Sequence, residues 1–407
     1  MTTKPPLPKC SSAPTRCTDW SGADLRRQLA QAGAAPEPHL ERDELLAAWF
    51  RLQLGGPERF DVDGVVELLP EGFGFLRFPG HDLLAGAADV YLSPSQVRGL
   101  NLQSGHRVRG AIRPPRGNER YFAMLHVDTV DGTPPEAARL RPAFGALQPI
   151  VATVPLPLGG DVPLWRTTAA LAPWCRGQRA LLRLPATWPR AVRLAELAAA
   201  ILAANPDVRV RLGLFDQRPE DLAAAKAACA ALPGVACVGT TFDAPAERHV
   251  ATAELLLAAV QREVESGAAV VLLVDSLTAL ARQGQLAQSA SGRYLAPGLD
   301  AVATQLGKRL FASARATAEG GSLTVLASVL HDTGHQVDAA IAAEFTGRGN
   351  SELRIDTALA ADGVLVPLDL AAVRTRPEDE VLSAHERTAA RALREALLAM
   401  PPAQRGR

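Results

Sequence analysis

The sequence predicts a multidomain protein of the α+β and α/β classes, with a small helical unit, a five-stranded β-barrel and a parallel sheet covered by helices. Two changes of pattern along the 407 residues support this. Short alternating runs separated by Gly and Pro fill residues 60–130, and apolar strands alternate with Ala-rich helices after residue 165. A chain of this length can form two or three domains, each with its own core.

The N-terminal part predicts a tail followed by helices. Residues 1–18 are rich in Pro, Ser and Thr, which is typical of a disordered tail. In residues 19–56 apolar side chains recur at helical spacing, for example at Leu25 and Leu29. We therefore expect a small helical unit of two or three helices before the barrel.

Residues 57–132 predict the barrel, because short alternating strands at regular spacing favour a small closed sheet. A linker rich in Pro and Gly follows at residues 133–165. The expected strands are Val65–Leu68, Gly72–Arg77, Asp89–Leu92, Arg107–Ile112 and Tyr121–Leu125.

Residues 166–390 predict a parallel sheet with helices on both faces, and residues 391–407 a C-terminal tail. The expected strands are Ala180–Leu184, Val208–Phe215, Val270–Val274, Leu323–Ser328 and Ser351–Ile355. The expected helices are Val192–Ala204, Pro219–Leu232 and Ala246–Ser266.

The composition restricts the classes of function. Lys and Arg together number 43 and so do Asp and Glu, so any nucleic-acid site has to be local rather than a general basic surface. Five cysteines form no CxxC pair, which predicts free thiols and no metal site. The N-terminus has no signal-peptide core and the longest apolar runs are too short to span a bilayer, so we expect a cytoplasmic protein.

Aromatic residues gather in the predicted barrel. Phe73 and Phe75 lie two apart on one strand and therefore share a face, and Tyr91 and Tyr121 lie on other strands. Aromatic faces on an open barrel surface stack on unpaired bases, and neighbouring charged side chains can read base edges and phosphates. The alternative is that the two phenylalanines are ordinary core residues or contacts of a dimer face.

Three segments here resemble the RNA-binding domain of the Rho family: residues 72–77, 89–96 and 113–123. The resemblance implies a barrel of the OB or cold-shock type and a primary site for single-stranded, pyrimidine-rich RNA. It implies an RNA-binding role for Gly72, Phe73, Gly74, Phe75, Leu76, Arg77, Asp89, Val90, Tyr91, Glu119, Arg120 and Tyr121.

The resemblance continues through the second half, in the segments 176–179, 241–245, 275–278 and 319–324. It implies a RecA-like ATPase domain that assembles as a ring of six, with ATP and magnesium between neighbours. It places Arg293 in a channel loop that contacts RNA and makes Arg376 an arginine-finger candidate. The residues that match its nucleotide site are Arg176, Gly177, Gln178, Arg179, Thr187, Arg190, Ala191, Val192, Arg218 and Asp275.

The chain departs from the family where the phosphates of ATP should bind. A phosphate loop needs glycines, a Lys and a Ser or Thr hydroxyl, but Pro189, Arg190 and Ala191 stand there. Trp188, just before them, is expected to add bulk where the phosphates should lie. Gln217 replaces the family's catalytic Glu and cannot accept a proton near neutral pH. The sequence therefore predicts a degenerate nucleotide site with no certain cofactor.

These observations predict a transcription termination protein that binds nascent single-stranded RNA and has weak or no ATPase activity. Its expected partners are identical chains or an active Rho in a mixed ring, together with RNA polymerase. One alternative is a working RNA-dependent ATPase and helicase that uses Arg190 and Arg218 in an unusual geometry. The other is a structural paralogue whose RecA-like half only builds an interface.

Overall fold

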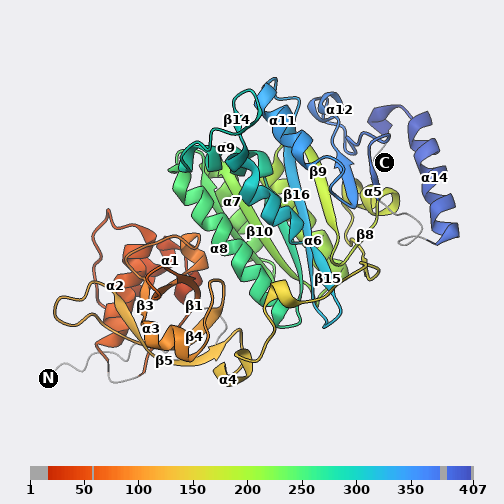
Figure 1. Cartoon of the computed structure of the whole chain (residues 1–407). Coiled ribbons are helices and arrows are strands. Elements are labelled where there is room, and N and C mark those ends of the chain that lie inside the picture. Colours follow the sequence, from red (N-terminus) through yellow and green to blue (C-terminus); the bar gives the residue numbers. More distant parts are fainter. Residues whose placement is uncertain (1–16, 57–58, 376–382, 405–407) are drawn as a thin grey trace. The chain divides into compact units, whose positions relative to one another are not determined.

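A computed structural model of the chain describes residues 17–56, 59–375 and 383–404. Most of the predicted N-terminal tail lies outside these residues. The chain divides into two compact units, the first formed mainly by residues before Ala143 and the second by most of the residues after it. Each unit is described by itself (Figure 1).

Two helices precede the barrel, as the spacing of apolar residues predicts. They are α1 (Gly22–Gln31) and α2 (Arg42–Leu54), after a short 3₁₀ turn at Cys17–Asp19. Ser21 begins α1 with a capping box, because its hydroxyl accepts from the Asp24 amide while the Asp24 carboxylate accepts from the Ser21 amide. The apolar faces of both helices join the core of the barrel.

The five expected strands form a closed barrel in the order β1-β2-β3-β5-β4. Only β3 and β5 run parallel; the other neighbours are antiparallel. Helix α3 (Pro94–Gly99) follows β3. The strands are β1 (Asp61–Leu68), β2 (Gly74–Arg77), β3 (Val90–Leu92), β4 (Arg107–Arg113) and β5 (Phe122–Val130).

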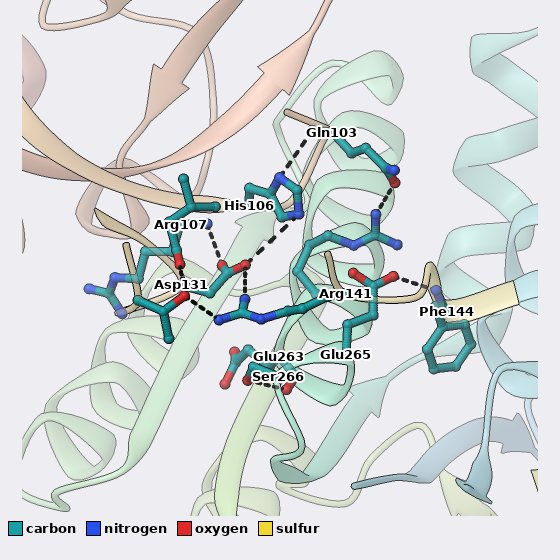
Figure 2. Close-up of polar contacts among 12 residues, drawn as sticks. Gln103, His106, Arg107, Asp131, Arg141, Phe144, Glu263, Glu265 and Ser266 are labelled. Atoms are coloured by element: carbon teal, nitrogen blue, oxygen red, sulfur yellow. Dashed lines mark hydrogen bonds and ion pairs between the residues drawn. The ribbon is translucent and has the colours of Figure 1, made fainter. Parts of the chain in front are cut away.

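A buried polar cluster joins β4 to the end of β5 (Figure 2). Asp131 accepts from the Arg107 amide at 2.8 Å and from Arg141 Nη1 at 3.1 Å. His106 Nδ1 accepts from the Gln103 amide at 3.1 Å, and its Nε2 lies 3.9 Å from Asp131 Oδ2. The carboxylate of Asp131 therefore ties a segment beyond the barrel to the barrel itself.

The second unit contains a nine-stranded sheet with the main order β11-β10-β12-β16-β9-β17-β18. The strands from β11 to β17 are parallel, and β18 is antiparallel to β17. The sequence missed the edge strand β11 (Val235–Thr241). The others are β9 (Arg179–Pro185), β10 (Arg209–Gln217), β12 (Ala269–Asp275), β16 (Ser322–His331), β17 (Ser351–Arg354) and β18 (Arg374–Thr375).

Helices cover both faces of this sheet (Figure 1). Alternate residues of the strands pack with α6 (Arg190–Ala204) and α7 (Pro219–Ala230) in one apolar cluster. Along β16 lie α9 (Leu277–Ala287), α10 (Gln305–Ala312) and α11 (Gln336–Phe345). The long helix α8 (Ala246–Glu265) precedes β12. The expected fold class is confirmed.

The predicted linker and the predicted C-terminal tail contain regular structure. Strand β6 (Pro149–Ile150) pairs with β15 (Arg315–Thr317) in the large sheet, because its extended backbone completes an open edge. Helix α14 (Ala384–Ala399) covers part of the predicted tail and begins at a Ser383 capping box. The remaining elements are α4 (Pro135–Ala138), β7 (Pro155–Leu156), α5 (Pro163–Leu171), β8 (Trp174–Cys175), β13 (Tyr294–Ala296), β14 (Leu299–Asp300) and α12 (Thr357–Ala361).

Among the described residues, no helix is both long and apolar enough to cross a membrane. The same residues hold no cluster of His, Cys, Asp or Glu with the arrangement of a metal site.

Candidate functional sites

Four aromatic side chains form one cluster on the outside of the barrel. The Phe73 and Phe75 ring centroids are 5.8 Å apart, as expected for residues that share a face. Phe75 lies 4.8 Å from Tyr121 and 6.0 Å from Tyr91. Phe75 is only 7% exposed, but its ring is covered by these neighbours, while the barrel core is formed by other side chains. Tyr121 is 42% exposed and offers a face for stacking.

Two glycines shape the strand that carries the phenylalanines. Gly72 has φ +88°, a conformation that side-chain-bearing residues rarely adopt, and turns the chain into β2. A Cβ at Gly74 would lie 2.8 Å from the Glu67 carbonyl oxygen, so only glycine lets β2 approach β1 there. The glycines therefore hold the strand that carries the phenylalanines in place, in addition to leaving room beside the rings.

The charged residues beside the aromatic cluster are buried rather than free to read bases. Arg77 is 6% exposed and Asp89 is 3% exposed, and they form an ion pair with each other. Arg77 also donates from Nε to Glu67 Oε2 at 2.6 Å. Its guanidinium lies 4.9 Å from the Phe75 ring centroid, a cation–π contact that supports the ring from below.

Burial has an electrostatic consequence for this pair. It raises the pKa of Asp89 to about 7, although the Arg77 cation and the Gly86 amide favour the carboxylate. Leu76 and Val90, also predicted at the RNA site, have side chains completely buried in the barrel core. Alternation sends them inward, so their side chains support the barrel rather than its outer surface.

The remaining predicted RNA contacts are exposed. Glu119 lies next to Arg113, with Arg113 Nη2 donating to its Oε1 at 2.8 Å. This hydrogen bond and the Arg116 amide lower the pKa of Glu119 to about 2, so it is an anion at neutral pH. Arg120 is exposed beside Tyr121. A stacking ring, a carboxylate and a guanidinium thus follow one another on the loop before β5.

The predicted phosphate loop connects β9 to α6 at the carboxyl edge of the sheet. In a parallel sheet the carboxyl ends of strands meet at one edge, where α/β proteins place their ligands. Gln217 ends β10 and Asp275 ends β12, while Arg190 begins α6. The structure therefore brings these three predicted residues together.

Asp275 is completely buried, and each of its oxygens accepts hydrogen bonds. Arg190 Nε donates to Oδ1 at 3.1 Å and to Oδ2 at 3.0 Å. Gln217 Nε2 donates to Oδ2 at 2.9 Å, and Ser328 Oγ donates to Oδ1 at 2.6 Å. Arg190 Nη1 also donates to the Ala186 carbonyl at 2.6 Å. The cation of Arg190 is thus held on the carboxylate and on its own loop.

Other loop residues are divided between the core and the surface. Ala191 is buried and Thr187 and Val192 are exposed. The expectation that Trp188 fills the space of the phosphates is not supported, because its ring is buried within the apolar cluster under the loop. What the loop presents to solvent is therefore set by its backbone, Thr187 and Pro189.

The segment 176–179 lies at the other end of β9 and is not brought to Arg190. A seven-residue strand separates the two by about 20 Å. Arg176 Nη1 donates to Asp207 at 2.6 Å, and Gln178 Oε1 accepts from the Cys175 amide at 3.0 Å. A Cβ at Gly177 would lie 2.3 Å from the Ala316 nitrogen. These contacts give the segment a structural role.

Arg179 Nη2 donates to the Ala314 carbonyl at 3.2 Å, and burial together with Arg315 lowers the pKa of its guanidinium. Arg218 begins α7 and is exposed near the carboxyl edge, and Arg293 is exposed before β13. Arg376, the arginine-finger candidate, lies outside the described residues.

Sequence reasoning missed two residues that hold these sites together. Ser328 hydrogen-bonds Asp275 from the neighbouring strand β16, and Glu67 pairs with Arg77 from β1. Ser328 lies inside the apolar run Val325–Leu330, and Glu67 lies between Val66 and Leu68; a polar residue inside an apolar run is the signal that could have identified them.

Comparison with known proteins supports both halves of the fold. Residues 62–136 match the family model for the RNA-binding domain of Rho termination factor. A solved ATPase from the type III secretion system of pathogenic bacteria is similar with a TM-score of 0.51, covering 70% of this chain and 78% of that one. At 21% identity this second likeness supports the fold alone. Fold and site thus define an RNA-binding protein whose OB-like barrel is joined to a RecA-like, ATPase-type sheet.

Several curated relatives are called transcription termination factor Rho. The one from Chromobacterium violaceum is 39% identical over 84% of this chain and 82% of its own length. The Haemophilus influenzae protein is 38% identical over 88% of this chain and 85% of its own length. The Aquifex aeolicus protein is 34% identical over 94% of this chain and 88% of its own length. The chain therefore belongs to the family of Rho transcription termination factors.

Proposed function

We propose that this Rho-family protein holds single-stranded, pyrimidine-rich RNA on the aromatic cluster of its barrel while having little or no ATPase activity. The supporting observation is the contrast between the two sites. Tyr121 exposes its ring at the edge of the aromatic cluster, whereas Asp275 already accepts from three protein donors.

The residues around Asp275 do not fit magnesium and ATP. A magnesium ion needs oxygen ligands with free lone pairs, and here a guanidinium occupies both oxygens of the carboxylate. Ala191 has no hydroxyl to complete the coordination. Pro189 removes one of the amides that would bind phosphate. Gln217 donates to Asp275 instead of accepting a proton from water.

In this proposal the protein acts on transcripts through binding rather than translocation. It works in the cytoplasm, as a homohexamer or in a mixed ring with an active Rho, beside RNA polymerase. A ring would carry several barrels, and linked sites bind one strand more tightly than a single barrel does. Subunits that do not hydrolyse ATP would then bind RNA without translocating it.

Two assays on the full chain test the proposal. Filter binding with oligo-C RNA in moderate salt should give saturable binding. Phosphate release from ATP by the chain alone should stay at background, with and without that RNA. In a mixture with an active Rho, the chain should lower the phosphate release per Rho subunit. The absence of RNA binding would refute the first half.

One alternative is a working ATPase that uses Arg218, which is exposed near the same edge of the sheet. RNA-stimulated phosphate release by the wild-type chain that disappears in Arg218→Ala would establish this alternative and overturn the proposal. A variant combining Pro189→Gly, Arg190→Lys, Ala191→Thr and Gln217→Glu serves as the matched comparison, since it restores the family's residues at the loop.

A further inference from the structure

A pocket of about 370 Å³ lies in the second unit, away from the loop around Arg190. Helix α14, the end of α5 and the segment leading into β18 form it. Small-ligand sites usually measure roughly 300–1,000 Å³, so the pocket can hold one small molecule.

Four arginines line this pocket, and no Asp or Glu is among the described residues that line it. Arg387, Arg391 and Arg394 are four and three residues apart on α14, which places them on one face of the helix. Arg374 comes from β18.

One of these guanidiniums is fixed in position. Arg394 Nη2 donates to the Val373 carbonyl oxygen at 2.8 Å, and Nη1 donates to that of Leu370. Main-chain carbonyls are neutral, so these bonds orient the side chain without cancelling its charge. A guanidinium that is already oriented loses less freedom when it binds a phosphate.

The walls between the arginines are apolar. Leu171, Leu370 and Val373 contribute to the lining and are otherwise buried. A pure inorganic anion would gain nothing from such walls, whereas a planar ring packs against them and stacks on guanidinium planes.

We infer that this pocket binds a small phosphate-bearing molecule with a planar ring, of the nucleotide class. Arginine pairs with phosphate through two parallel N–H···O bonds, and Arg374, Arg391 and Arg394 provide enough donors for more than one phosphate group. The concave shape favours one compact ligand over an RNA strand, which needs an extended groove. This site is separate from the aromatic cluster and from the loop.

The test is fluorescence anisotropy of methylanthraniloyl-labelled ATP with the full chain, without magnesium. The double variant Arg374→Glu, Arg391→Glu should weaken binding at least about tenfold, because two charge-assisted contacts are reversed. The double variant Arg309→Glu, Arg348→Glu, the same charge change on exposed residues elsewhere in the second unit, should have no effect.

Competition identifies the ligand chemistry. Unlabelled ATP should displace the probe at lower concentration than inorganic tripolyphosphate, and oligo-C RNA should not displace it. Equal displacement by tripolyphosphate overturns the nucleotide assignment, and displacement by RNA assigns the pocket to a strand instead. Absence of binding, or binding that is kept in the double variant Arg374→Glu, Arg391→Glu, refutes the site. The milder Arg391→Gln keeps the test valid if the double variant does not fold.

Discussion

Arg190 Nε lies 3.0 Å from Asp275 Oδ2, so the residue that the sequence predicts at the position of a phosphate-binding Lys forms an internal ion pair. The carboxylate is fully buried and the guanidinium is 15% exposed at its side chain. An ion pair this far from solvent stabilises the loop only while both partners are present.

Arg190→Ala is therefore expected to destabilise the chain by about 3–5 kcal/mol, since it leaves a buried carboxylate with only neutral donors. Urea unfolding followed by circular dichroism measures the change. Arg193→Ala on the same helix is the control, because its exposed pair with Glu196 should contribute under about 0.5 kcal/mol. Equal stability of both variants would show that the Arg190–Asp275 pair is not stabilising.

Tyr121→Ala should weaken binding of oligo-C RNA about 5- to 150-fold, the effect of losing one base stack worth roughly 1–3 kcal/mol. Because Tyr121 is 42% exposed, the barrel should keep its unfolding midpoint. Leu125→Ala, which removes an exposed side chain from β5, should leave RNA affinity unchanged. If the two variants bind alike, the aromatic cluster is not the RNA site.

His106 makes the barrel sensitive to acid. Burial, together with nearby arginines including Arg141, lowers its pKa to about 4. The unfolded chain takes up this proton near pH 6.5 and the folded chain only near pH 4, so stability is lost as pH falls through that window. The loss amounts to about 3 kcal/mol. Denaturation curves of the wild type and of His106→Gln between pH 7 and 4 measure this loss of stability. The variant should lose less stability than the wild type as the pH falls. An equal loss in both would show that His106 does not cause the acid sensitivity.

Titration of Asp89 changes the stability of the folded chain with pH in the direction opposite to that of His106. Its pKa is raised to about 7 by burial, so the folded chain binds the proton more readily than the unfolded chain. Stability therefore falls as pH rises from about 4 to 7, by up to roughly 4 kcal/mol. In Asp89→Asn this decline should disappear. A variant that declines as steeply as wild type would show that Asp89 does not titrate in this range.

The fold was predictable because its signals are local. Alternation located all five barrel strands, and apolar runs located β9, β10, β12, β16 and β17 to within a few residues. Strand β11 was missed because its apolar run, Val235–Val238, is only four residues long and is followed by Gly239 and two threonines. Helix α14 was assigned partly to a tail because its sequence is polar and only Leu397 is fully buried.

The sites were predictable in outline but not in their pairings. The residue types at Arg190, Gln217 and Asp275 were visible in the sequence, but their mutual hydrogen bonds join separate strands and need the fold. Arg77 and Asp89 were expected to read bases, whereas the structure pairs them beneath Phe75. The type of a residue does not show whether its charged side chain is exposed to solvent or paired with another residue.

The hydrogen bond from Gln217 to Asp275 also restricts how this lineage can change. A lone Gln217→Glu replacement would set two carboxylates against each other at a separation of about 3 Å, with Arg190 alone to neutralise both. A glutamate at position 217 is thus disfavoured as long as Arg190 is the one cation beside Asp275. The neutral amide of Gln217 therefore couples the two positions, and a change of charge at one of them requires a compensating change at the other.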